Sequence, residues 1–515
     1  MADAENLVPP ARVLELQAVL IDATCRFLQQ RVPALSEQQL RFLCEPWAHF
    51  FVHSALHRAE LLGQAPAPGQ DLAFYGADRA VPGDTLAFFE WFRSQSYRCY
   101  LDATLAGQEG TLDCRTEVYV LGSEASALAA TVCFKPCFPR NFRYLLHFYS
   151  LGRVGFMPDK PVYVAVRPDW TLRVALAACL RKALALGHPA LADWLARCAA
   201  ELCPKSLLEH LPVNFIAKCN SRARSALYSA DAWHIIDDWK VYALAQKTQH
   251  QARWIGSPNA LSHGSLAVFW QREFELGVLD RYLTWGWAAL ALPGKEIVPF
   301  YSPHFAGRSQ AKPVHTADKT GLLISAAARP QHLLEYPYTP DRFERYLHTQ
   351  LALATQAHTL TGQPVTIRTR PRELGWEVQS MVQALDLPGV TLEFQQGKFS
   401  ERLAQCRLHI CDNCSTTIAE SLWANHPTLI LITEDYFQVR PEAAGDYDAL
   451  AAAGIFHTSQ ESLLRQLARL ETDLDAWWQA NTTQAAIRRF LDRQGRTGSG
   501  LRHWKSALLV GTVGP

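Results

Sequence analysis

The sequence predicts an α/β protein in which the C-terminal half forms a doubly wound parallel sheet and the N-terminal half is rich in helices. From Gly321 onward, short continuous apolar runs alternate with helical patterns, as is typical of parallel strands covered on both faces. The chain has 515 residues, more than one hydrophobic core usually serves, so two domains are expected. Its composition, 49% hydrophobic and 19% charged residues, is that of a globular protein.

The elements of the C-terminal half follow one another as strand and helix. We predict strands at residues 321–327, 364–369, 390–394, 407–412 and 427–433, and helices at 341–361, 376–385, 400–405 and after 417. These elements define a doubly wound, Rossmann-like domain at 318–475. Ligands of such sheets bind beyond the carboxyl ends of the strands.

The first half is less regular. We predict helices at Leu14–Gln30 and Glu37–Leu62, and strands at residues 118–122, 127–134 and 161–166. Gly294–Ala317, rich in Pro, Gly, Ser and His, is the predicted linker. We therefore place an N-terminal domain at 1–310 and expect the helical segment 476–515 to pack across both domains.

Charge and cysteine usage narrow the class of protein. The net charge of +1 comes from 50 basic and 49 acidic residues, which argues against a nucleic-acid binder. There is no signal-peptide pattern and no run of 18 apolar residues, and 13 cysteines without a disulfide-rich spacing suit a reducing compartment. We expect a cytoplasmic protein. Leu172–Cys203 and the basic C-terminal segment fit either core-packed helices or amphipathic helices peripheral to the inner face of the membrane.

The segment HICDNCSTTIAESLWAN, from His409, combines the end of a strand, a polar loop and the start of a helix. Thr417 with Glu420 three residues later fits a capping box. The N-terminus of a helix attracts anions, so Ser415, Thr416 and Thr417 are candidates for binding a phosphate. An ordinary N-cap loop without a ligand is the alternative.

Several separate stretches agree, in order, with one known family. They are EPWAHFFVH from Glu45, PGDTLAFFE from Pro82, LDRYLTWGW from Leu279, NCSTTIAESLWANHPTLI from Asn413, GIFHTSQES from Gly454, and DAWWQ followed by WKSAL. On these residues the chain resembles a bacterial family of surface-carbohydrate transferases with a two-domain, glycosyltransferase-B-like architecture. The resemblance implies transfer of a sugar from a nucleotide-sugar donor, held by the C-terminal domain, to a cell-surface glycan or glycolipid acceptor.

The chain departs from this family at one loop. Where the family has Gly-Gln-His-Gly-Gly after a strand, this chain has IGSPNALSHG from Ile255, so that Pro258 stands at the position of the expected histidine. The nearest histidine is His263. Either His263 has taken over the role of the general base in an inverting transfer, or the activity is reduced or different. Glu275, just ahead of the RYLTWGW stretch, is the rival base, and a loop histidine without a special role is the third interpretation.

The resemblance also suggests the donor contacts. Ser415, Thr416 and Thr417 would bind the donor phosphates. Arg368 and Arg370 alternate at a predicted strand end and would either neutralise the leaving nucleotide or belong to a solvated basic loop. Glu420 is either a capping carboxylate only or also a ribose or sugar contact.

Two further groups have a structural and a functional interpretation. Trp285 and Trp287 would stack on a sugar or, more in keeping with their place at a domain junction, pack in a core. Cys406, His409, Cys411 and Cys414 suggest zinc, but without a second CxxC motif we expect buried structural cysteines. No Asp-x-Asp pair follows a strand, so neither an essential metal nor a cofactor is predicted.

Two other functions fit the same residues. A CDP-polyol phosphotransferase of the teichoic-acid type would also set a hydroxyl-bearing helix N-terminus against a nucleotide diphosphate. A catalytically degenerate protein that binds a glycan or a protein partner is kept open by Pro258.

Overall fold

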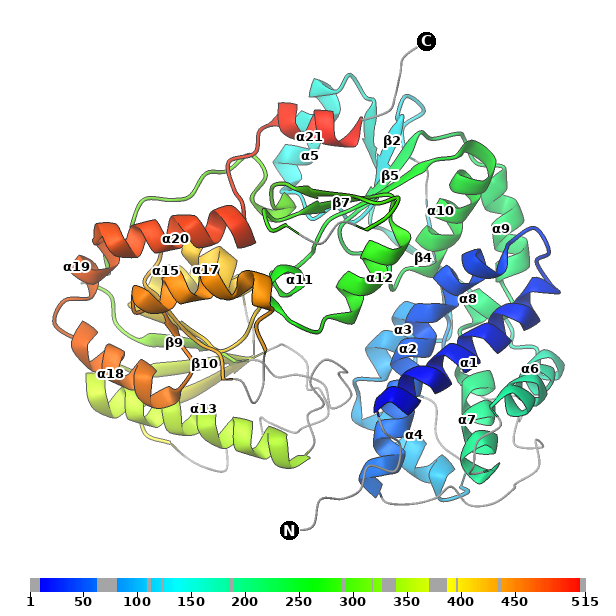
Figure 1. Ribbon diagram of the computed structural model, residues 1–515, viewed down its shortest axis with the longest axis horizontal. Coiled ribbons are helices and arrows are strands. Elements are labelled where there is room, and N and C mark those ends of the chain that lie inside the picture. Colours follow the sequence, from blue (N-terminus) through cyan, green and yellow to red (C-terminus); the bar gives the residue numbers. More distant parts are fainter. Residues whose placement is uncertain are drawn as a thin grey trace.

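The chain forms two six-stranded parallel sheets, one in each half, and a separate antiparallel pair of strands. The computed structural model describes residues 10–62, 81–108, 113–122, 125–184, 189–288, 292–316, 318–326, 340–369, 387–394, 397–433 and 438–509. Figure 1 shows the two sheets beside each other, with a layer of N-terminal helices below the first. The predicted α/β class with a doubly wound parallel sheet in the C-terminal half is confirmed, and the N-terminal half, predicted as rich in helices, contains a second parallel sheet.

The N-terminal sheet has the strand order β3-β2-β5-β6-β7-β8. Its strands are β2 (Thr131–Cys133), β3 (Val154–Phe156), β5 (Ala226–Ser229), β6 (Arg253–Gly256), β7 (Arg281–Thr284) and β8 (Glu296–Pro299). All neighbours are parallel, and the order changes direction between β2 and β5. Loops that leave the carboxyl ends of the strands near such a point form binding crevices.

Two of the predicted N-terminal strands lie outside this sheet. β1 (Val118–Leu121) and β4 (Pro161–Val164) pair antiparallel with each other. The predicted linker Gly294–Ala317 is wrong at its beginning, because β8 completes the sheet there. The later part, which includes the short 3-10 turn η2 (Pro303–Phe305), joins the two halves.

Helices cover this sheet and build a layer of their own. They are α1 (Pro10–Gln29), α2 (Glu37–Leu62), α3 (Thr85–Trp91), α4 (Gln95–Leu105), α5 (Arg140–Tyr149), α6 (Trp170–Ala183), α7 (Pro189–Leu202), α8 (Lys205–Leu208), α9 (Leu211–Cys219), α10 (Asp237–His250), α11 (Ser262–Ser265) and α12 (Trp270–Val278). The two helices predicted at the N-terminus are confirmed as α1 and α2. Nearly all of α7 is buried, so the apolar stripe of Leu172–Cys203 faces the core rather than a membrane.

The C-terminal sheet has the strand order β11-β10-β9-β12-β13-β14. Its strands are β9 (Leu322–Ser325), β10 (Val365–Thr369), β11 (Val390–Phe394), β12 (Leu408–Cys411), β13 (Thr428–Leu431) and β14 (Phe456–His457). All are parallel. Numbered within the sheet, this is the 3-2-1-4-5-6 order of dinucleotide-binding folds, with its switch point between β9 and β12. The five strands predicted from apolar runs are confirmed.

The helices of this half are α13 (Pro340–Thr361), α15 (Phe399–Gln405), α16 (Thr416–Trp423), α17 (Pro441–Ala452), α18 (Gln460–Leu470), α19 (Leu474–Gln479), α20 (Asn481–Gln494) and α21 (Leu501–Leu508). The helix predicted at 376–385 lies outside the described residues.

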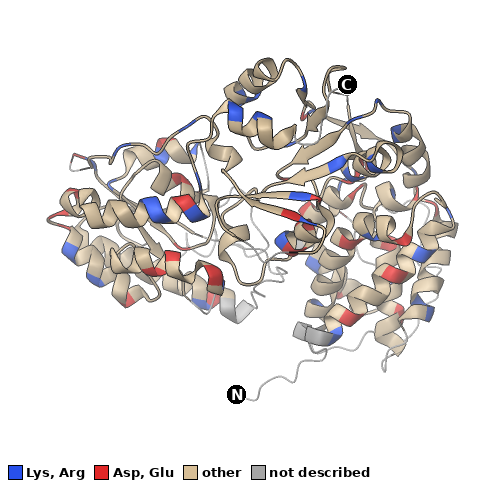
Figure 2. Ribbon diagram, turned by 45° about the horizontal axis from the view of Figure 1, so that its top comes forward, with Lys and Arg blue, Asp and Glu red and all other residues tan. Residues whose placement is uncertain are grey.

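Among the described residues, every helix is too short or too polar to cross a lipid bilayer. Figure 2 shows acidic and basic residues interspersed over both halves.

The chain crosses back to the N-terminal half at its end. After α20, which packs against α16 and α17, α21 lies against α5 at the top of Figure 1. Trp504 of α21 is fully buried, with its ring 4.6 Å from that of Phe138 and 4.9 Å from that of Phe300. The Thr131 hydroxyl donates to the Leu508 carbonyl at 2.7 Å. Helix α21 is therefore part of the hydrophobic core of the N-terminal half.

Replacing Trp504 by alanine should lower the free energy of unfolding by about 3–5 kcal/mol, because a large buried aromatic side chain is lost together with its contacts. Urea unfolding of the full chain measures the change. Arg502→Ala, at an exposed neighbouring position, is the control and should change stability by no more than about 0.5 kcal/mol. Equal effects of the two substitutions would contradict the docking of α21.

Candidate functional site

Two loops, one from each sheet, contact each other at the carboxyl ends of their strands. The turn α11 follows β6, and the loop that begins at Asp412 follows β12. The Ser262 hydroxyl of α11 donates to the Cys414 carbonyl at 2.5 Å. On the same turn, Ser265 accepts a hydrogen bond from the Tyr447 hydroxyl at 2.9 Å. The structure thus brings the residue before His263 against the residue before Ser415.

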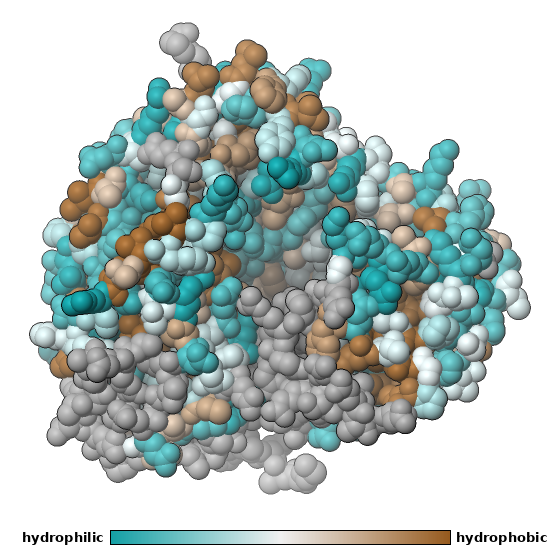
Figure 3. Space-filling view, turned by 180° about the vertical axis from the view of Figure 1, so that it is seen from behind, coloured by the Kyte–Doolittle hydropathy of each residue, from teal (hydrophilic) through white to brown (hydrophobic). Residues whose placement is uncertain are grey.

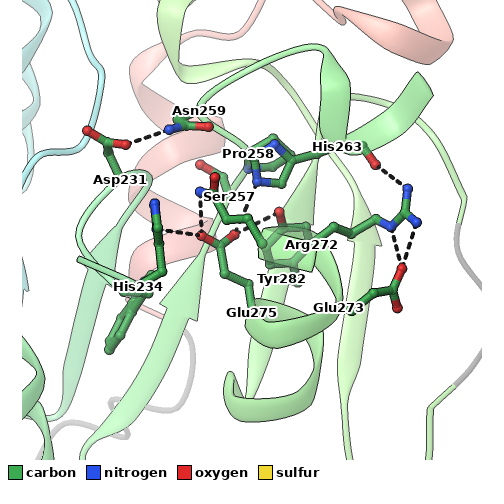
Figure 4. A network of polar contacts seen from close by, with 12 residues as sticks. Asp231, His234, Ser257, Pro258, Asn259, His263, Arg272, Glu273, Glu275 and Tyr282 are labelled. Atoms are coloured by element: carbon green, nitrogen blue, oxygen red, sulfur yellow. Dashed lines mark hydrogen bonds and ion pairs between the residues drawn. The ribbon is translucent and has the colours of Figure 1, made fainter. Parts of the chain in front are cut away.

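His263 is fully buried on the N-terminal side of this contact. Its Nε2 atom lies 3.5 Å from Oε2 of Glu275, and its ring meets the edge of Phe269 at 4.7 Å. Among the described residues, neither ring nitrogen has a hydrogen-bond partner. Buried polar atoms are rarely left without one, so this imidazole is a candidate for contacting a ligand. Figure 4 shows it directed toward Glu275.

Glu275 lies at the centre of the polar network on α12. Its carboxylate accepts hydrogen bonds from the Tyr282 hydroxyl and from the Gln271 amide, both at 3.0 Å. Nδ1 of His234 lies 3.8 Å away on its other side. Burial, together with the charge of Glu275, raises the pKa of Tyr282, which keeps the phenol protonated as a donor. The structure brings the two rival candidates for the base, His263 and Glu275, next to each other.

His234, the other neighbour of Glu275, is uncharged because of its surroundings. Burial lowers the pKa of His234 well below its usual value, and the nearby His263, Lys240 and Arg93 lower it further. His234 is therefore neutral near pH 7. On the same helix as Glu275, the Arg272 guanidinium donates to the carbonyl of His263 at 3.1 Å. Helix α12 therefore contacts His263 twice: Arg272 binds its backbone carbonyl, and Glu275 lies beside its imidazole.

A second carboxylate lies in the loop after β5. Asp231 accepts a hydrogen bond from the side-chain amide of Asn259, and burial raises the pKa of Asp231. Pro258, at the place where a histidine was expected, accepts a hydrogen bond at its carbonyl from the Trp285 indole at 3.0 Å. Figure 4 shows Pro258 and Asn259 on the loop that leads to His263.

The helix of the predicted phosphate loop begins at Thr416, with Ser415 as its N-cap. The predicted capping box of Thr417 and Glu420 is therefore wrong by two positions. Ser415 Oγ accepts from the amide of Thr417 at 3.4 Å, and the Thr417 hydroxyl contacts Ser415 Oγ and also Cys411 Sγ, the latter at 3.3 Å. Thr416 occupies the first helical position. All three side chains are partly exposed at the head of α16.

The remaining donor candidates do not join this loop. Glu420 lies one turn into α16, where burial raises the pKa of its carboxyl. Arg368 is buried and pairs with Glu393 on the neighbouring strand β11, and it also donates to the Gly397 carbonyl at 2.8 Å. It therefore faces β11, on the side of β10 away from β12, where Glu393 also pairs with Arg402. Arg370 lies outside the described residues.

A buried histidine fixes the switch point beneath the loop. The imidazole of His409 lies between two hydroxyls, Ser325 Oγ of β9 and Ser421 Oγ of α16, each at 2.8 Å. Asn413 adds a bond from its amide to the Ser325 carbonyl at 3.2 Å. Strand β9, strand β12 and helix α16 are therefore held together where the loop leaves the sheet.

The cysteines of this region are buried and face different neighbours. Cys406 Sγ lies 3.5 Å from His426, Cys411 contacts Thr417, and Cys414 lies 3.7 Å from the Tyr447 hydroxyl. Burial raises the pKa of the Cys411 thiol to about 12. Across the described residues no three ligand-type side chains converge on a metal position. Trp285 and Trp287 are also buried and pack as core aromatic residues at the junction.

Sequence reasoning missed the residues that surround His263. His234 and Asp231 follow β5, whose four residues ALYS were not predicted as a strand. Had that strand been recognised, the segment DAWH would have been placed at the carboxyl end of the sheet. Tyr282 gave no comparable signal, because it lies inside β7.

Comparison with known proteins gives one family and several distant structures. The sequence model of the LIC12162 family of transferases matches residues 138–509. No curated protein matches the chain. Solved structures with partial similarity are MurG of Acinetobacter baumannii (11% identity, 73% of this chain and 98% of that chain, TM-score 0.34), Thermobaculum terrenum O-GlcNAc transferase (13%, 97% and 99%, 0.31) and Medicago truncatula UGT71G1 with UDP-glucose (9%, 71% and 98%, 0.33).

The buried imidazole of His409 makes a prediction about acid stability. Burial lowers the pKa of His409 to about 3, so between about pH 6.5 and that value the unfolded chain binds a proton that the folded chain does not. This residue should therefore cost the fold about 2 kcal/mol on acidification from about pH 7 to about pH 5. Urea unfolding of His409→Gln should show a smaller loss over that range than the parent protein, whereas the exposed-site control His503→Gln should match the parent. An unchanged pH dependence in His409→Gln would contradict the assignment.

Proposed function

The chain belongs to the LIC12162 family of transferases, and we propose that it is a glycosyltransferase that moves a sugar from a nucleotide-sugar donor to a cell-surface glycan or glycolipid acceptor. The observation that supports this most is the hydrogen bond between Ser262 and the Cys414 carbonyl. It joins a buried base from one sheet to a hydroxyl-bearing helix N-terminus from the other. Transfer between two substrates needs these two functions side by side.

On the donor side, we assign the phosphates to the head of α16. Ser415, Thr416 and Thr417 supply hydroxyls, and the first turn supplies backbone N–H groups and the positive end of the helix dipole. These groups would stabilise the charge that develops on the phosphate as the bond to the sugar breaks. Because Arg368 is already paired with Glu393, we assign the stabilisation of the phosphate charge to the helix N-terminus.

On the acceptor side, we assign the general base to His263 and a positioning role to Glu275. The acceptor oxygen attacks the anomeric carbon, the bond from that carbon to the donor phosphate breaks, and the acceptor proton passes to the imidazole. Glu275 lies 3.5 Å from Nε2, where a carboxylate orients the ring and stabilises the imidazolium that forms. Nδ1, the ring nitrogen farther from this contact, would receive the acceptor proton.

In this proposal, three segments of the chain have different roles. Residues 1–310 would hold the acceptor, residues 318–475 the donor, and residues 476–515 would tie the two together through α20 and α21. The 13 cysteines are free thiols, which supports a site of action in the reducing cytoplasm.

Donor binding is tested by thermal shift with a panel of nucleotides. At least one nucleotide should raise the melting temperature, because a ligand at about 100 times its Kd adds about 2.7 kcal/mol to native-state stability. The combined change of Ser415, Thr416 and Thr417 to alanine should abolish the shift. Ser459→Ala removes the N-cap of α18 in the same half, and it should lower stability but keep the shift.

Two results would overturn this assignment. No response to any nucleotide would exclude a sugar transferase and a CDP-polyol transferase together and leave a binding protein without turnover. A shift that survives the triple alanine change would move the donor site elsewhere. Release of a nucleoside diphosphate would favour sugar transfer, whereas release of CMP is shared by CMP-sugar and CDP-polyol donors and does not separate them.

The base is tested by the kinetics of nucleotide release. His263→Gln should lower kcat about 10²–10⁴-fold, the usual contribution of a general base, while keeping the nucleotide-induced thermal shift. Glu275→Gln should lower kcat less and change its pH profile, because the imidazole remains but loses its carboxylate. His457→Gln, in a hydrogen-bonded position of the other half, should leave kcat unchanged. Turnover lost in Glu275→Gln but kept in His263→Gln would make the carboxylate the base.

A further inference from the structure

Helix α5 lies on the surface and exposes several large apolar side chains. Phe142 and Leu146 point into the core, while Tyr144, Leu145, Phe148 and Tyr149 are exposed, Phe148 to 72% of its surface. Leu151, just after the helix, is 81% exposed and adopts a left-handed backbone with φ of 55°. A group of exposed apolar side chains on one helix is normally covered by another apolar body.

We call this surface the α5 face: Tyr144, Leu145, Phe148, Tyr149 and Leu151, with Leu128 beside Gly152. Leu128 is itself 72% exposed. Figure 3 shows apolar side chains gathered at the top of the molecule, where α5 and α21 lie in Figure 1. Such a cluster of large exposed aromatic and aliphatic residues marks an interaction surface rather than scattered surface apolar residues.

Basic residues predominate around the α5 face. From residue 125 to residue 158 the sequence contains no Asp or Glu, but it contains Lys135, Arg140, Arg143 and Arg153. The segment 493–515, which includes α21 packed against α5, has no acidic residue and four basic ones. Of these cations, Lys135 pairs with Asp159 and Arg493 with Asp446. Lys505 of α21 lies 5.0 Å from the ring of Tyr149. The apolar side chains are thus flanked by cations.

We propose that the α5 face docks on the surface of an anionic lipid bilayer. Aromatic and aliphatic side chains that enter the interface, with Lys and Arg beside them reaching the headgroups, are the two components of interfacial membrane binding. Tyrosine suits the boundary because its ring is apolar and its hydroxyl is polar. A second copy of the chain fits less well, since a two-fold contact through this face would set its basic residues against each other.

The two ends of α5 lie at different edges of the sheet. The first turn of α5 follows the loop after β2, at the same edge of the sheet as the loops of Asp231 and His263. The α5 face lies toward the other edge, because Leu128 precedes β2 and Leu151 precedes β3. A bilayer bound there would leave the loops of the candidate site uncovered.

The test is co-sedimentation of the full chain with vesicles. Phosphatidylcholine vesicles that contain phosphatidylglycerol should bind the protein, and binding should weaken as salt is raised. The double change Leu145→Ser and Phe148→Ser should lower the partition coefficient roughly tenfold or more, because two apolar side chains no longer enter the interface. Arg140→Gln with Arg502→Gln should lower binding to anionic vesicles and remove most of its salt dependence.

A matched control uses another exposed apolar pair. Val213→Ser with Ile216→Ser, on α9 at 67% and 65% exposure, should bind vesicles as the parent does. Equal binding of the α5 double variant and the parent would overturn the proposal. So would a parent protein that ignores vesicles, or one that is a dimer in solution and becomes a monomer on the α5 changes. Vesicle binding is measured without donor or acceptor, so its failure would leave the proposed chemistry untouched.

Discussion

The contact between α11 and the loop after β12 determines how the two halves of this protein cooperate. Through the hydrogen bond from Ser262 to the Cys414 carbonyl, and that from Tyr447 to Ser265, the carboxyl ends of two parallel sheets are turned toward each other. Each sheet contributes one part of the candidate site: one has a buried imidazole beside a carboxylate, and the other has a helix N-terminus with hydroxyls. In the function we propose, transfer between two bound substrates takes place at their junction.

Much of the C-terminal half could be predicted because its strands are buried on both faces. Runs such as LLIS and TLIL are apolar without interruption, and this pattern needs no knowledge of tertiary contacts. The exact start of α16 could not be predicted, since Ser415 and Thr417 are both acceptable N-caps and only the backbone decides between them. The ion pair of Arg368 could not be predicted either, because its partner Glu393 lies on the next strand, 25 residues further along the chain.

The N-terminal half was harder for a physical reason. Strands such as ALYS, RWIG and RYLT contain polar or charged residues, so they lack the continuous apolar run that marks a strand buried on both faces. The site residues His234 and Asp231 follow one of these strands and were missed with it. His263 and Glu275 were chosen as candidates from their places beside recognisable stretches, and the structure shows how the buried Glu275 is stabilised: Tyr282 and Gln271 donate to its carboxylate.

Hydrogen exchange with and without a bound nucleotide tests the central claim, that one site is built from both sheets. If it is correct, a nucleotide that stabilises the protein should slow exchange in residues 412–418 at the head of α16 and also in residues 257–266 around α11, because these segments are hydrogen-bonded to each other. Protection of residues 412–418 alone, or of neither segment, would contradict a shared site.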